Sequence, residues 1–372
     1  MKGSVGCEFV GLESATSHVS GVGGHPCQGL YWATSGTRPK LAFIANHYNG
    51  DFSEHYLAPH VARLGCGFLG WNTRYRGVED AFSLEHALID IGAGLRWLRE
   101  SAGVEQVVLL GNSGGGSLMA AYQAASQSAI AWPELPGVVV DALADLPGGD
   151  FYVSLNAHPG RPDVLTEWLD PAVVDESDPV ATDPELDAFH PDRQPPFDED
   201  YVARYRAAQR DRNARITAWA ETELQRIEAA GYRDRLFPLF RTWADLRFLD
   251  ATIDPSDRPC PACYAGDPRQ ANRSPFGLGR ANTLRTWLSM WSLSRSQCRG
   301  ELHLPHIRLP SLVLQSLGDT GVFPSHARMI ESLLGSDDKS LEWLDGDHYF
   351  VSPDNARVEL AARIDGWLQA RR

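Results

Sequence analysis

The chain has 372 residues and a formal net charge of −14, with 43% hydrophobic and 22% charged residues. This length predicts one large domain with an insertion, or two domains. The negative charge, with no basic stripe to reverse it locally, excludes nucleic acid as an expected partner. No apolar run approaches the roughly 18 residues that span a bilayer, so a membrane is excluded as well.

The N-terminal segment and the cysteines indicate the cellular compartment. Residues 1–21 lack the continuous apolar stretch of a secretory signal, so we expect a cytoplasmic protein. The six cysteines are scattered, which favours reduced thiols over a disulfide framework. Cys260 and Cys263 have metal-like spacing, but neither a second cysteine pair nor a histidine couple stands nearby. We therefore expect no metal and no organic cofactor.

Short apolar runs alternate with helical patterns in the first half of the chain. This order builds a parallel sheet with helices on both faces. A glycine, Gly65, ends the first predicted helix, and apolar residues recur at helical spacing in the second. The predicted elements are strand Leu41–Ala45, helix 55–64, strand 67–71, helix Leu84–Glu100, strand 107–110, helix 117–125 and strand 151–156.

The texture of the sequence changes from about residue 159 to residue 300. Clusters of Pro and Asp, a long charged stretch over 200–230 and a Trp-rich stretch over 284–293 replace the alternating pattern. A structureless connection of that length would be unusual, so a mainly helical insertion is predicted. After it, the alternating order resumes with strand 311–316, helix 325–334, strand 340–344 and helix 358–368.

A glycine-rich turn joins the strand 107–110 to the helix 117–125. Its residues Gly111-Asn112-Ser113-Gly114-Gly115 match the pattern G-x-S-x-G. The glycines of this pattern let a strand turn sharply into a helix and leave the serine hydroxyl exposed. The strand before it and the helix after it favour Ser113 as a nucleophile over an idle serine in a turn.

A serine nucleophile needs a base, and the base needs a group that fixes its tautomer. Asp319 follows the strand 311–316, and His348 follows the strand 340–344. Both are therefore expected at the carboxyl ends of strands, where open parallel sheets place their sites. The order Ser, Asp, His is the one expected for this arrangement. Three other candidates for the acid stay open, namely Asp163, Asp345 and Asp347.

Four segments together resemble the α/β-hydrolase superfamily, over roughly residues 25–157 and 305–372. They are Asn46-His-Tyr-Asn-Gly50, the GNSGG turn, Gly318-Asp-Thr-Gly321 and Gly346-Asp-His348. The resemblance implies a mostly parallel sheet with helices on both faces, and a helical cap inserted after the sixth strand. It divides the chain into a core of residues 1–158 and 301–372 and a cap of residues 159–300.

The resemblance also implies an oxyanion hole. In that superfamily the backbone N–H after the nucleophile and another from the loop after the third strand form the hole. Here these are Gly114 and, as the preferred second donor, Asn49, with Tyr48 as the alternative. Many members carry His-Gly in that loop, whereas this chain has His47-Tyr48. The predicted substrate-binding residues are Tyr48, His47, His158, Trp287 and Trp291, and a packing role is the alternative for each of them.

The sequence thus predicts a serine hydrolase of the carboxylesterase or lactonase type, acting through an acyl-enzyme on Ser113. The aromatic cap favours a bulky, apolar ester or lactone as the small-molecule substrate. An acyltransferase or a thioesterase with the same triad is the alternative among enzymes. A ligand-binding protein that has lost turnover is the alternative from another class. The cap helices could form a homodimer interface as readily as a lid over the site.

Overall fold

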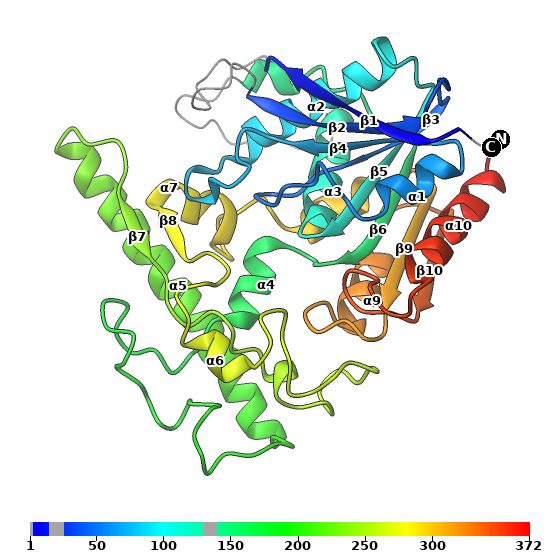
Figure 1. Cartoon of the computed structure of the whole chain (residues 1–372). Helices are drawn as coiled ribbons and strands as arrows, with labels where there is room; N and C mark the ends of the chain where they lie inside the picture. The colour runs from blue at the N-terminus through cyan, green and yellow to red at the C-terminus, as the bar shows by residue number, and fades with distance from the viewer. Residues whose placement is uncertain (1–2, 15–25, 129–139) are drawn as a thin grey trace.

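The computed structural model describes residues 3–14, 26–128 and 140–372. The segment 1–21, on which the expectation about a secretory signal depends, lies partly outside these ranges. The described residues contain an eight-stranded sheet in the order β1-β2-β4-β3-β5-β6-β9-β10 (Figure 1). β2 runs antiparallel to both β1 and β4, and the remaining neighbours are parallel. The strands are β1 Val5–Leu12, β2 Cys27–Thr34, β3 Leu41–Ala45, β4 Gly67–Asn72, β5 Gln106–Ser113, β6 Phe151–Ala157, β9 Ser311–Ser316 and β10 Lys339–Leu344.

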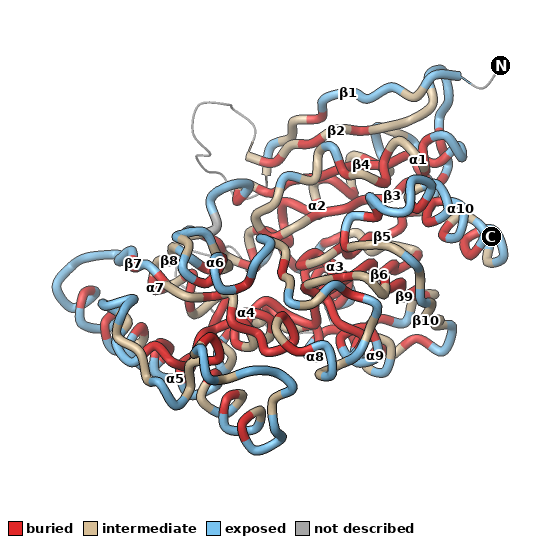
Figure 2. Tube along the Cα trace, turned by 60° about the horizontal axis from the view of Figure 1, so that its bottom comes forward, coloured by how far each residue is buried: buried red, intermediate tan, exposed pale blue. Residues whose placement is uncertain are grey.

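Helices cover both faces of this sheet. Side chains alternate between the faces of a strand, so Ala42 and Ile44 of β3 join one core cluster while Leu41 and Phe43 join another. The first cluster includes residues of α2 and α3, and the second includes residues of α1 and α10. Figure 2 shows the central strands buried and β1 exposed at the edge. The helices are α1 Ala58–Arg63, α2 Leu84–Glu100, α3 Gly115–Ser126, α9 Pro324–Leu333 and α10 Ala356–Gln369.

Most of the regular secondary structure in the insertion between β6 and β9 is helical, as predicted. Its longest helix, α5, begins after Asp198, whose side chain accepts a hydrogen bond from the Tyr201 N–H at 2.7 Å. Long irregular stretches and the small sheet of β7 and β8 complete it. Its elements are α4 Arg161–Trp168, α5 Glu199–Ala229, β7 Leu236–Pro238, α6 Pro268–Asn272, β8 Ala281–Thr283, α7 Leu284–Thr286, a π-helix at Trp287–Trp291 and α8 Gly300–His303.

Three features differ from the sequence prediction. The helix predicted for 55–64 begins only at Ala58, because His55 Nδ1 accepts the Leu57 N–H at 3.2 Å in a turn and proline occupies the start of the helix. The hairpin of β1 and β2 was not predicted. The Trp-rich stretch contains a π-helical turn rather than one continuous α-helix. None of the described helices is both long and apolar enough to cross a membrane.

Candidate active site

Ser113 lies at the sharp turn between β5 and α3. Its backbone φ is 55°, which lies in the left-handed region. Residues other than glycine rarely adopt this conformation, and those that do are often found at functional turns. The flanking glycines permit the tight path. A Cβ on Gly111 would lie 2.7 Å from Gly116 Cα, and one on Gly115 would lie 2.3 Å from the Asn46 carbonyl oxygen. The G-x-S-x-G pattern therefore forms the turn for which its glycines are suited.

Hydrogen bonds fix this turn against the neighbouring strand. Asn112 Nδ2 donates to the Leu155 carbonyl at 2.8 Å, and Asn112 Oδ1 lies 3.0 Å from His55 Nε2. The His158 N–H donates to the Ser113 carbonyl at 3.1 Å. Because all these partners are buried, the turn has little freedom to move.

Asp319 and His348 meet in the loops that follow β9 and β10. His348 Nδ1 lies 2.6 Å from Asp319 Oδ2, and both side chains are buried. The other carboxylate oxygen, Oδ1, accepts the backbone N–H groups of Gly321 and Val322, each at 2.9 Å. The carboxylate is thus held in place, and its contact with Nδ1 puts Nε2 on the side of the ring away from Asp319.

A buried asparagine ties these loops to the sheet edge near Ser113. Asn156, at the end of β6, has a φ of 41°. Its Oδ1 accepts the Ser316 N–H at 2.7 Å, and its Nδ2 donates to the His348 carbonyl at 3.2 Å. Because β6 lies between β5 and β9 in the sheet, the predicted nucleophile, base and acid all stand over one edge.

The alternative acids are engaged elsewhere. Asp163 forms an ion pair with Arg299, with 3.1 Å between Oδ1 and Nη2. Asp347 accepts the backbone N–H groups of Tyr349, Val351 and Ser352 and so shapes its own loop. Asp345 is exposed. Of the four candidates, Asp319 is the one with a hydrogen bond to His348.

Tyr264 of the insertion is a site residue that the sequence did not predict. Its hydroxyl donates to Asp319 Oδ1 at 3.0 Å and lies 2.8 Å from His348 Nδ1. Burial, and then the charge of Asp319, raise the pKa of Tyr264 well above its usual value, so the hydroxyl keeps its proton. No pattern in the sequence connects a tyrosine after Cys263 to the acid, because the contact spans more than fifty residues.

Ser113 opens onto a cavity of about 500 Å³ between the sheet edge and the insertion. This volume is within the range of small-molecule sites. Most of its aromatic wall comes from the insertion, and its charged groups are two arginines and an aspartate. The lining residues are His47, Asn49, Gly77, Asp80, Ser113, His158, Arg161, Trp168, Trp243, Tyr264, Phe276, Gly277, Leu278, Arg280, Ala281 and Tyr349.

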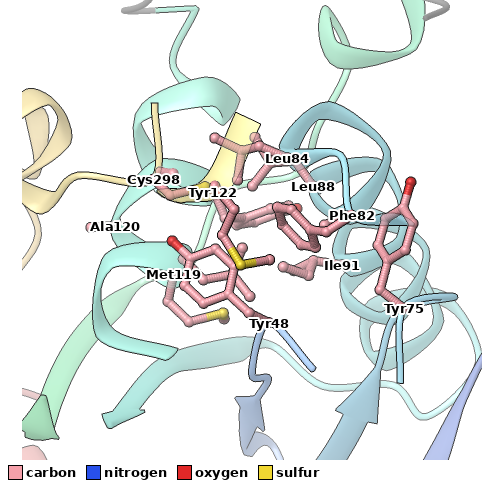
Figure 3. Packing of buried hydrophobic residues seen from close by; sticks show 14 of the residues in the cluster. Tyr48, Tyr75, Phe82, Leu84, Leu88, Ile91, Met119, Ala120, Tyr122 and Cys298 are labelled. Atoms are coloured by element: carbon pink, nitrogen blue, oxygen red, sulfur yellow. The ribbon is translucent and has the colours of Figure 1, made fainter. Parts of the chain in front are cut away.

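The predicted substrate-binding residues separate into two groups. His47 and His158 line the cavity, as does Asn49. Tyr48, Trp287 and Trp291 are fully buried and are not among the lining residues, so the expectation that they face substrate is not met. Tyr48 packs in the core cluster beside Phe82 (Figure 3). Its hydroxyl lies 3.0 Å from Ser117 Oγ. The large aromatic surface that suggested a substrate face is core.

A cation and two neutral histidines line the same cavity as Ser113. Arg161, at the start of α4, is buried, with its guanidinium over the rings of Tyr48 and Trp291 at 5.2 and 4.6 Å. Burial, followed by the charge of Arg161, lowers the pKa of His47 to about 3. Burial, followed by the nearby His326 and His348, lowers the pKa of His158 well below its usual value. Both rings are therefore uncharged at neutral pH.

The described residues offer no group of three or more His, Cys, Asp or Glu side chains arranged to hold a metal ion. Cys260 and Cys263 are free thiols. Burial raises the pKa of both thiols, and it raises that of Cys263 to about 11. Both thiols are therefore protonated near neutral pH.

Solved structures with a similar fold cover nearly the whole chain. The α/β hydrolase GrgF from Penicillium sp. sh18 is 10% identical, with a TM-score of 0.51 over 98% of each chain. DcsB, solved in complex with its substrate analogue, is 12% identical, with a TM-score of 0.52 over 98% of this chain and 99% of the other. The chain matches no family model and no curated protein sequence. It has the α/β-hydrolase fold, which by itself does not determine a reaction.

Proposed function

We propose that the protein hydrolyses a carboxylic ester or lactone through an acyl-enzyme on Ser113. The observation that carries this proposal is the 2.6 Å hydrogen bond between His348 and Asp319 at the same sheet edge as a serine in a strained turn. These groups have the roles and the chain order of a serine nucleophile, its base and the orienting acid.

In the proposed reaction, His348 Nε2 takes the hydroxyl proton of Ser113 while Oγ bonds to the acyl carbon. The carbonyl π electrons move to the oxygen, which becomes an oxyanion next to the Gly114 N–H. When this intermediate collapses, the carbon–oxygen bond to the alcohol breaks, and the leaving alkoxide takes the proton from His348. Asp319 stabilises the imidazolium while it exists.

Water completes the cycle by the same chemistry. His348 takes a proton from water, the hydroxide oxygen bonds to the acyl carbon, and the acid leaves as Ser113 recovers its proton. The proposed steps use side-chain and backbone groups of the chain together with water.

The cavity supports a bulky substrate with an apolar or aromatic acyl group. Trp168, Trp243 and Phe276 contribute apolar surface to the wall of the cavity that Ser113 also lines. Such walls gain affinity by removing apolar surface from water. Among p-nitrophenyl esters of increasing acyl size, we expect kcat/KM to rise toward the bulky members. Activity confined to the acetate ester would contradict this choice of substrate.

The proposal is tested by ester hydrolysis and fluorophosphonate labelling of the wild type, Ser113→Ala and Ser117→Ala. Ser117 is the matched control, because it is buried one helical turn away with its hydroxyl against Tyr48. We expect wild type and Ser117→Ala to be labelled and active, and Ser113→Ala to be neither. An active Ser113→Ala would overturn the proposal. Added alcohol or thiol acceptors distinguish acyl transfer from hydrolysis by their products.

A further inference from the structure

The imidazole of His47 lies against the residue expected to bind the oxyanion. A Cβ built on Gly114 would be 2.7 Å from His47 Nε2 and 3.0 Å from Arg161 Nη1. His47, Arg161 and Ser113 line the same cavity. The Nε2 edge of the ring therefore lies against Gly114 at the cavity onto which Ser113 opens. The tetrahedral intermediate would place its charged oxygen at this residue, near the Gly114 N–H.

Backbone hydrogen bonds fix which nitrogen of His47 carries the proton. The Gly50 N–H donates to Nδ1 at 3.1 Å, and the Asn49 N–H points at the same atom at 3.4 Å. Since Nδ1 accepts, the proton of the neutral ring is on Nε2. The ring thus presents an N–H donor, rather than a lone pair, toward Gly114.

The charge state of the ring suits a donor and not a base. Burial, followed by the charges of Arg161 and His348, lowers the pKa of His47 to about 3. A ring of such low basicity does not compete with His348 for the proton of Ser113. The neighbouring guanidinium adds positive charge where negative charge would develop, which favours the same intermediate.

We propose that the Nε2–H of His47 is the second donor of the oxyanion hole, beside the Gly114 N–H. This inference rests on the proposed function and adds a catalytic side chain to it. The resemblance to the superfamily favours the backbone N–H of Asn49 as the second donor. In the structure the Asn49 N–H points at His47 Nδ1. We therefore assign to the backbone of Asn49 and Gly50 the role of holding His47 in the tautomer that carries its proton on Nε2.

The test compares His47→Ala and His47→Gln with the wild type, with His306→Ala as the control at an exposed histidine outside the cavity. We expect kcat of His47→Ala to fall about 10²- to 10³-fold with little change in KM. His47→Gln should recover much of this loss, because its amide nitrogen reaches about as far as Nε2. An aryl boronic acid, whose adduct with serine mimics the charged intermediate, should lose affinity in parallel with kcat.

A loss confined to KM, or an unchanged boronic acid affinity in folded His47→Ala, would overturn the inference. Circular dichroism establishes that each variant is folded. If His47→Ala does not fold, the ¹⁵N chemical shifts of His47 in the wild type provide the test, and a proton on Nδ1 at pH 7 overturns the assignment. A wild type without esterase activity would instead refute the proposed function, so the two failures are distinguishable.

Discussion

The sheet edge and the insertion contribute to the site in different ways. The edge supplies Ser113 at the end of β5, and Asp319 and His348 in the loops that follow β9 and β10, each fixed by buried hydrogen bonds. The insertion supplies most of the cavity wall and reaches the acid through one hydroxyl, that of Tyr264. The proposed reacting groups lie at the ends of strands of the central sheet, and the insertion gives the cavity its shape.

This division predicts different kinetic consequences. Changes at the edge should act on kcat, because they alter groups that handle the proton and the developing charge. Changes in the wall of the insertion should act on KM or on stability, according to whether the side chain faces the cavity or the core.

The largest effect is expected for Asp319→Asn. An amide cannot accept the Nδ1–H of His348 as a carboxylate does, and its own N–H favours the wrong tautomer. We expect kcat to fall about 10⁴-fold in ester hydrolysis, with the fold retained. Asp163→Asn is the matched control and should cost less than about threefold. Equal losses in the two variants would mean that Asp319 is not the orienting acid.

Substitution of two tryptophans of the insertion tests the difference between a core residue and a residue of the cavity wall. Trp287 is fully buried with its indole N–H 3.0 Å from Thr217 Oγ1, so Trp287→Ala should lower the free energy of unfolding by about 3–5 kcal/mol. Trp243 lines the cavity, so Trp243→Ala should mainly raise KM for bulky esters. Urea unfolding and steady-state kinetics measure both quantities. A rise in KM for Trp287→Ala at unchanged stability would break the distinction.

The buried histidines predict a loss of stability in acid. Burial lowers the pKa of His55 to about 4, whereas the unfolded chain titrates near 6.5. Below pH 6.5, His55 is therefore protonated in the unfolded state, whereas in the folded state it stays neutral until about pH 4. The stability contributed by neutral His55 is complete above pH 6.5, and about 3 kcal/mol is lost as the pH falls through this window.

Urea unfolding between pH 7 and pH 4 measures this effect. His55→Gln should flatten the dependence of the unfolding free energy on pH, whereas His306→Ala, at an exposed histidine, should leave it unchanged. If His55→Gln has the slope of the wild type, buried His55 is not the source.

The smallest effect is expected for Tyr264→Phe, which removes one hydrogen bond to Asp319 and keeps the ring. A hydrogen bond to a charged group contributes about 1.5 kcal/mol or somewhat more, so kcat should fall about tenfold with KM nearly unchanged. Tyr349→Phe, at the neighbouring cavity residue, is the control. An effect on KM alone would mean that Tyr264 contributes to the cavity wall and does not position Asp319.

Much of the core could be predicted from the sequence because its signals are local. The strand Leu41–Ala45 and the helix Leu84–Glu100 were predicted with the bounds that the structure gives. The rule that loops at the carboxyl ends of parallel strands converge also placed Asp319 near His348. The hairpin of β1 and β2 was missed because β1 is a largely exposed edge strand without a clear alternation of apolar residues.

Part of the remaining site depends on contacts that no local pattern encodes. Tyr264 meets Asp319 only because the insertion folds back over the sheet edge. Arg161 begins the helix after β6, so the carboxyl-end rule that placed Asp319 would also have singled it out. Trp287 and Trp291 have the spacing of a helix face, but spacing does not indicate whether a face meets substrate or core.

The central claim, covalent catalysis at Ser113, is tested most directly by trapping the acyl-enzyme. Rapid mixing with a slowly deacylating p-nitrophenyl ester should release a burst of p-nitrophenol close to one equivalent per active site. Acid quenching and peptide mass spectrometry should then find the acyl group on Ser113. Hydrolysis without a burst or adduct, or an adduct on another residue while Ser113→Ala remains active, would contradict the account.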